Sequence, residues 1–163
     1  MSEISWPTPF GYTIFCDDIR HEISGKTTFV GIYAGEMILH VPLPAIYPKL
    51  CLAIHYTERP GESTEPVRIE VSLPGDEIDK PAIVADLPID QMRNRPPPSD
   101  PGADDPRLGV QFHMGLTPLQ ILKEGRIKVR AIRGEDVIRL GSLLIRSDAP
   151  EAVNPPNEPL LQS

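Results

Sequence analysis

Gly125-Arg-Ile-Lys-Val-Arg-Ala-Ile-Arg-Gly-Glu-Asp-Val-Ile-Arg-Leu-Gly-Ser-Leu-Leu-Ile-Arg146 is the stretch that decides the fold class. Apolar and basic side chains alternate through its first half: Ile127, Val129 and Ala131 against Arg126, Lys128 and Arg130. A period of two is that of a half-buried antiparallel strand, whose successive side chains point to opposite faces. A turn at 134–136 and a second apolar run follow, so the stretch predicts a β-hairpin.

Partway along the second strand of this hairpin, the apolar residues change from even-numbered to odd-numbered positions. Ile138 and Leu140 share one face, but Leu143 and Ile145 follow at an odd spacing, with Gly141 at the change. One extra residue in a strand produces such a shift, and a glycine is typical of the position. The sequence therefore predicts a β-bulge at Gly141.

Short runs rich in Val, Ile, Tyr and Phe recur along the rest of the chain, separated by turn residues. We expect strands near residues 11–17, 27–33, 36–41, 49–57, 66–73, 81–87, 107–114, 126–133 and 137–146. No long segment has a period of 3.6, which argues against an α/β fold. The pattern favours an all-β antiparallel sandwich of seven to nine strands, immunoglobulin-like or C2-like.

The regions outside the strands complete the predicted organisation. Thr117 can cap a helix, Pro118 suits its first turn and Gly125 can end it, so a short helix is expected near residues 118–124. The proline-rich break from Asp90 to Arg107 is interpreted as a disordered loop. We expect an N-terminal arm at 1–10, the sandwich domain at 11–148 and a disordered proline-rich tail at 149–163.

Charge and composition limit the class of protein. The net charge of −7 argues against general nucleic-acid binding. The start of the chain has no secretory pattern, and no apolar run is long enough for a membrane span. These features predict a cytoplasmic protein, in which Cys16 and Cys51 are reduced by default. A disulfide between them stays possible if their strands are neighbours.

Residues 15–33 read Phe-Cys-Asp-Asp-Ile-Arg-His-Glu-Ile-Ser-Gly-Lys-Thr-Thr-Phe-Val-Gly-Ile-Tyr. This run resembles the opening of a family of uncharacterised bacterial proteins, in which a Cys/Asp-containing strand, a polar segment and a Gly-Lys-x-x-x-x-Gly pattern begin a β-sandwich. The C-terminal hairpin is similar too, and short motifs extend the resemblance over most of 11–146. The resemblance implies an immunoglobulin-like or C2-like sandwich, and it implies no activity or catalytic residue.

The densest polar cluster of the sequence is Cys16, Asp17, Asp18 and His21, together with Arg20. A hydrolase or a small-ligand site would use Cys16 as nucleophile and His21 as a base oriented by a carboxylate. On a strand, Cys16 and His21 point to opposite faces, whereas on a helical turn Asp17 and His21 are neighbours. The ordinary interpretation is a buried cysteine followed by a solvated charge cluster.

Metal and cofactor sites have little support in the sequence. The four histidines, at 21, 40, 55 and 113, form no metal-binding spacing, so no metal site and no cofactor are predicted. The acidic loops at 76–79 and 99–105 can gather around Ca²⁺ as in C2-type sandwiches, which makes a calcium-dependent surface binder a further alternative. Solvated loops explain the same residues.

The best binding surface is the basic stripe of the C-terminal hairpin. Arg126, Lys128 and Arg130 share a face, and Arg139 extends it across the hairpin. Residues 126–146 hold six basic and two acidic side chains in an acidic chain, although a solvated sheet face explains such a stripe equally. We expect a non-enzymatic binding or assembly module of the bacterial cytoplasm, whose partner is an unknown protein or a second copy.

Overall fold

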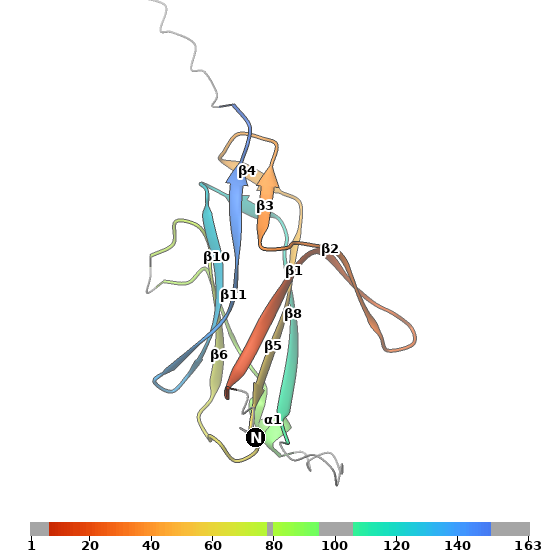
Figure 1. Ribbon diagram of the computed structural model, residues 1–163, viewed down its shortest axis with the longest axis vertical. Coiled ribbons are helices and arrows are strands. Elements are labelled where there is room, and N and C mark those ends of the chain that lie inside the picture. Colours follow the sequence, from red (N-terminus) through yellow and green to blue (C-terminus); the bar gives the residue numbers. More distant parts are fainter. Residues whose placement is uncertain (1–6, 78–79, 95–105, 151–163) are drawn as a thin grey trace, which may run out of the picture.

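The computed structural model describes residues 7–77, 80–94 and 106–150. Its strands form two main sheets that face each other as the layers of a sandwich (Figure 1). The first sheet has the order β2 (Thr27–Ile32), β1 (Phe10–His21), β5 (Leu50–Glu58), β8 (Leu108–Leu116). The second has the order β3 (Glu36–Leu39), β11 (Asp136–Ser147), β10 (Gly125–Arg133), β6 (Val67–Ser72), β7 (Ile83–Asp86). The prediction of an all-β sandwich is confirmed.

Neighbouring strands of both sheets are antiparallel, except that β3 runs parallel to β11. The core lies between the sheets, where alternate side chains of each strand meet. Leu52, Ile54 and Tyr56 of β5 belong to this core together with Ile127 and Val129 of β10. In the C-terminal hairpin, Ile127, Val129 and Ala131 are 2% exposed or less, as the alternating pattern predicts.

The predicted bulge is present in the C-terminal hairpin. Val129 pairs with Gly141 and Arg130 pairs with Arg139, so Leu140 is the extra residue of β11. Gly141 has a φ of 129°, in the region that favours glycine, and Leu140 and Leu143 on either side of it are both buried. The turn is shorter than predicted, because Arg133 already pairs with Asp136.

The helix predicted near 118–124 is wrong. Residues Leu119–Ile121 form strand β9, which pairs with β4 (Ala45–Tyr47) in a separate two-stranded sheet. Leu119 and Ile121 are buried while Gln120 is exposed, so the segment has the period of a strand. The capping residues at 117 and 125 suggested a helix, but burial of alternate side chains decides the structure.

The described helix, α1 (Ile89–Arg93), lies instead at the start of the predicted loop from Asp90 to Arg107. Ile89 is buried in the core, and Met92 packs against it. The loop prediction is therefore wrong for 90–94, while residues 95–105 lie outside the described residues. The predicted tail at 149–163 lies mostly outside them too. No described helix has the length and apolarity needed to cross a membrane.

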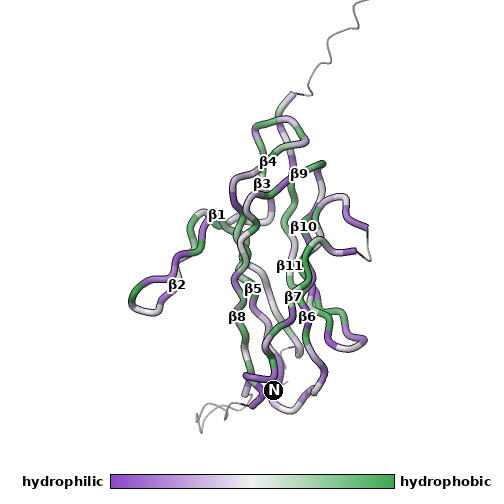
Figure 2. Tube along the Cα trace, turned by 180° about the vertical axis from the view of Figure 1, so that it is seen from behind, coloured by the Kyte–Doolittle hydropathy of each residue, from purple (hydrophilic) through white to green (hydrophobic). Residues whose placement is uncertain are grey.

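Beyond Cys16, β1 leaves β5 and pairs with β2 alone. The resulting outer hairpin, residues 17–32, stands away from both layers of the sandwich (Figures 1 and 2). Its contact with the first sheet is aromatic: the His21 ring stacks on His113 of β8 at 5.1 Å, and Phe29 meets the same ring edge-on at 6.1 Å. This hairpin carries most of the predicted polar cluster.

Candidate functional site

Two adjoining depressions lie on the outer face of the second sheet, over the basic stripe. The first has a volume of about 550 Å³ and lies beside the bulge, and the second has a volume of about 230 Å³. Lys128 and Arg130 line both depressions, Arg139 and Ser142 line the first, and Arg126 lines the second. We call the two depressions together the basic groove. The structure thus places all four residues of the predicted binding surface around these two depressions.

The local fold explains why these side chains share a face. Alternation along β10 sends Arg126, Lys128 and Arg130 away from the core. Arg139 pairs with Arg130 across the hairpin, and Ser142 pairs with Lys128. Because Leu140 is an extra residue between these pairs, Arg139 and Ser142 both turn outward although their separation is odd. The bulge therefore places the polar groups of both strands in the first depression.

The four basic residues differ in how far their charge is already neutralised. Arg130 donates to Glu70 with 2.7 Å between Nε and Oε2, and Arg68 contacts the other oxygen of Glu70 at 2.9 Å. Glu70 is 5% exposed, so Arg130 is held against β6 and is only partly accessible, contrary to the expectation of an open stripe. Arg126 donates to the hydroxyl of Ser142 at 3.2 Å.

Lys128 and Arg139 have no acidic partner among the described residues, and both are exposed. The first depression has no acidic side chain in its described lining, whereas Asp76, Glu77 and Glu124 line the second. The positive charge that can bind a ligand is therefore concentrated in the first depression, between Lys128 and Arg139.

The predicted polar cluster does not converge on one point. Asp17 accepts hydrogen bonds from the hydroxyls of Tyr33 at 2.5 Å and Tyr47 at 3.3 Å. Asp18 accepts from Lys49 at 2.5 Å and Arg20 at 3.2 Å, and these bonds lower the pKa of its carboxyl. The two carboxylates thus have separate sets of partners.

The other two members of the cluster have different surroundings again. Cys16 is fully buried, and burial raises the pKa of its thiol, which opposes formation of the nucleophilic thiolate. The ring of His21 stacks on the ring of His113, and no contact with a carboxylate orients it among the described residues. Cys51 lies directly opposite Cys16 on β5, and both thiols are free. The hydrolase and small-ligand alternative stays a prediction with no contact in its favour.

The loop that suggested calcium is only partly described. Asp76 uses its carboxylate to accept hydrogen bonds from the backbone N–H groups of Leu73 at 2.7 Å and Ala82 at 3.2 Å. It therefore holds its own loop together. No group of three or more potential metal ligands occurs among the described residues, and the acidic segment at 99–105 lies outside them.

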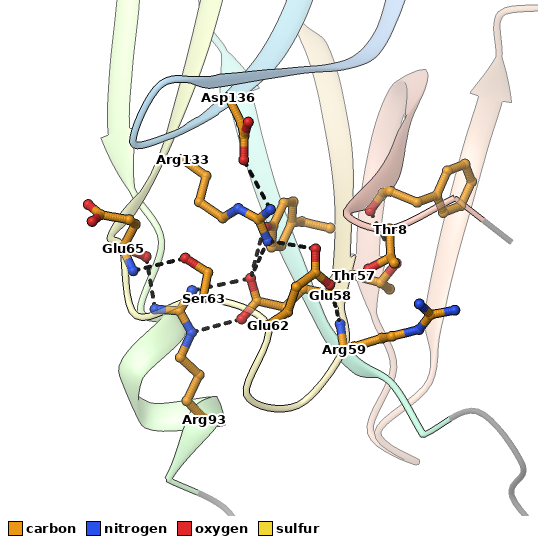
Figure 3. Close-up of polar contacts among 12 residues, drawn as sticks. Thr8, Thr57, Glu58, Arg59, Glu62, Ser63, Glu65, Arg93, Arg133 and Asp136 are labelled. Carbon is orange, nitrogen blue, oxygen red and sulfur yellow. Dashed lines mark hydrogen bonds and ion pairs between the residues drawn. The ribbon is translucent and has the colours of Figure 1, made fainter.

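A buried ion network was not predicted from the sequence (Figure 3). Glu58 is fully buried and accepts from Arg93 of α1, with 2.7 Å between Oε1 and Nε, and from the hydroxyl of Tyr56 at 2.9 Å. Arg133 lies 3.5 Å from Glu58 and also contacts Glu62 and Asp136, each at 3.1 Å. Arg133 is 7% exposed, so it does not add to the surface field of the hairpin. The network fastens α1 to the sandwich.

No protein-family model and no curated protein matches the chain. The resemblance carried by residues 15–33 stays a prediction.

Proposed function

We propose that the protein is a non-enzymatic binding module whose basic groove holds an acidic segment of a partner protein. The observation that carries this proposal is the placement of Lys128 and Arg139 around one depression with no described acidic partner. Both side chains extend from the two strands of one hairpin, which is packed on the core through Val129 and Leu143. A binding surface on a packed hairpin loses little conformational entropy when it is occupied.

A short acidic segment suits this groove better than a long polyanion. The chain carries a net charge of −7, so a nucleic acid would be repelled over most of the surface. Along the sheet, the groove passes from Lys128 and Arg139 to Glu77 and Glu124 within its second depression. A ligand with a few acidic residues at one end and polar residues at the other matches that change of charge.

The cell compartment in this proposal is the bacterial cytoplasm. The resemblance of residues 15–33 to bacterial proteins supports the bacterial origin. The two cysteines are buried and free although they lie opposite each other on neighbouring strands, which suits a reducing compartment.

The proposal is tested with a fluorescein-labelled poly-glutamate peptide and fluorescence anisotropy. We expect the peptide to bind the wild-type protein and binding to weaken as salt rises, because screening shortens the reach of the two cations. Lys128→Glu/Arg139→Glu should reduce the affinity about tenfold or more, since two attractions become repulsions.

The matched control is Arg146→Glu, which reverses one charge on the same strand outside the groove. A loss of affinity in this variant equal to that of Arg139→Glu alone would show that the peptide senses only the net charge. Unchanged binding in the double variant would contradict the assignment of the site.

A further inference from the structure

The edges of the two sheets are protected to different degrees. β3 and β7, at the edges of the second sheet, have four residues each and carry Glu36 and Asp86. Short edge strands with charged side chains resist pairing with other chains. β8 ends the first sheet with nine residues and no charged side chain. It is the long edge of the described structure that lacks this protection.

β8 is also a regular strand. It pairs with β5 through nine consecutive residue pairs without a shift of register, from Leu50 with Leu116 to Glu58 with Leu108. The other edge of the first sheet, β2, is interrupted, because its pairing with β1 skips Asp17 and Gly31, where Gly31 has a φ of 67°. Figure 1 shows β8 as the last strand of its layer, with α1 beside its start. A regular, uncharged edge presents an uninterrupted row of backbone donors and acceptors to a new strand.

The sequence of β8 is close to a palindrome. It reads Leu108-Gly-Val-Gln-Phe-His-Met-Gly-Leu116, with Phe112 at the centre. An antiparallel copy of the same strand, placed by a two-fold axis at Phe112, pairs like with like: Leu108 with Leu116, Gly109 with Gly115, Val110 with Met114, Gln111 with His113. Apolar residues meet apolar residues on the inner face, and polar residues meet polar residues on the outer face.

We propose that β8 pairs antiparallel with β8 of a second copy of this chain, joining two four-stranded sheets across a two-fold axis. Isologous contacts of this kind use one patch on both subunits and close after two chains. Phe112 and Met114 are only partly buried in the single chain, and the second copy extends their apolar surroundings. The pairing is centred on 110–114, because α1 contacts β8 and lies beside its start (Figure 1).

The outer face offers a second, polar feature. Nε2 of His113 is buried and has no hydrogen-bond partner among the described residues. The two-fold pairing brings the amide of Gln111 from the second copy next to this ring. A buried polar atom without a partner is costly, so an amide that reaches Nε2 beside the His21 and Phe29 rings of the outer hairpin favours the pairing.

The response to salt distinguishes pairing through β8 from binding in the basic groove. The central part of β8 has no ionised acid or base to place against its own copy, but each chain carries −7 overall. Salt screens that repulsion between the two copies. The dimer therefore strengthens as salt rises, whereas binding in the basic groove weakens.

The test is light scattering coupled to size-exclusion chromatography, over a range of protein concentrations at low and at high salt. We expect a mass that rises with concentration toward that of two chains, and rises further at high salt. Gln111→Lys and Gln111→Glu should both return the protein to the mass of one chain, because the two copies of residue 111 lie diagonally across the axis, about 7–8 Å apart, and like charges there repel.

Gln120→Lys is the matched control, since Gln120 is exposed as well but lies on β9, away from the edge. It should leave the mass unchanged, and far-ultraviolet circular dichroism should show that the Gln111 variants are folded. A single chain at every concentration and salt would overturn the proposal. So would a dimer that survives both Gln111 variants, or one that is lost in Lys128→Glu/Arg139→Glu.

Discussion

Arg130 and Glu70 form an ion pair between β10 and β6, with 2.7 Å between Nε and Oε2. Glu70 is 5% exposed and also contacts Arg68, so its single negative charge is shared between two guanidinium groups. This arrangement holds Arg130 against the sheet and leaves Lys128 and Arg139 as the cations of the first depression without an acidic partner among the described residues. The charge of the basic groove is therefore set partly by an acid that lies beneath it.

Glu70→Gln should increase the affinity of the groove for poly-glutamate. The substitution keeps the shape of the side chain and removes the negative charge that neutralises Arg130. The affinity should also depend more steeply on salt, as expected when a further cation contributes to binding. Anisotropy at several salt concentrations measures both effects, and a lower affinity in this variant would show that Arg130 binds only when Glu70 positions it.

Val129→Asp should destabilise the fold by about 3–5 kcal/mol, because it places an unpaired charge in the core. Lys128→Asp, one residue away on the exposed face, should change the free energy of unfolding by about 0.5 kcal/mol or less. Urea denaturation measures both. Equal losses in the two variants would contradict the register of β10.

Removal of the buried carboxylate of Glu58 should strongly lower the free energy of unfolding. Glu58→Ala leaves Arg93 and Arg133 without their shared partner, and breaking a buried ion pair costs about 3–5 kcal/mol. Asp90→Ala removes an exposed contact to the same Arg93 at 3.8 Å and should cost about 0.5 kcal/mol or less. If both variants had the same midpoint in urea, the network would not be what fastens α1.

The stability of the protein should fall in mild acid. Burial and, to a lesser degree, the neighbouring His21 lower the pKa of His113, and burial lowers that of His55. Both rings bind protons less readily in the folded than in the unfolded chain. The stability they contribute is complete above the unfolded pKa near 6.5 and is lost as the pH falls below it.

Urea denaturation at neutral and at mildly acidic pH measures this loss. His113→Gln should make it smaller, while His40→Gln, which replaces an exposed histidine, serves as the matched control. A loss of stability in acid that is the same in wild type and His113→Gln would assign the effect to other groups.

The elements that were predicted correctly are those with a strong local pattern. Alternation along 126–131 predicted which side chains of β10 face the core, and the change of parity around Gly141 predicted the bulge. Neither feature depends on which strands are neighbours. The common face of Arg126, Lys128, Arg130 and Arg139 follows from the same local pattern, because a single hairpin supplies them.

What the sequence did not predict depends on distant partners. α1 has five residues, and Glu58, which it binds through Arg93, lies 35 positions away. β9 has three residues and needs β4 as its partner, so the capping residues at 117 and 125 were a misleading local signal. The separation of Asp17 from His21 likewise depends on contacts with Tyr33 and His113, which no spacing within residues 16–21 reveals.

An NMR titration with poly-glutamate tests the proposed function most directly, because it locates the ligand on the surface. We expect the backbone amide signals of Lys128, Arg139 and Ser142 to shift as the peptide is added, and these shifts to disappear in Lys128→Glu/Arg139→Glu. Signals of the outer hairpin around Asp17 and Asp18 should stay in place. Shifts that are centred on the outer hairpin, or that persist in the double variant, would contradict the assignment of the basic groove as the binding site.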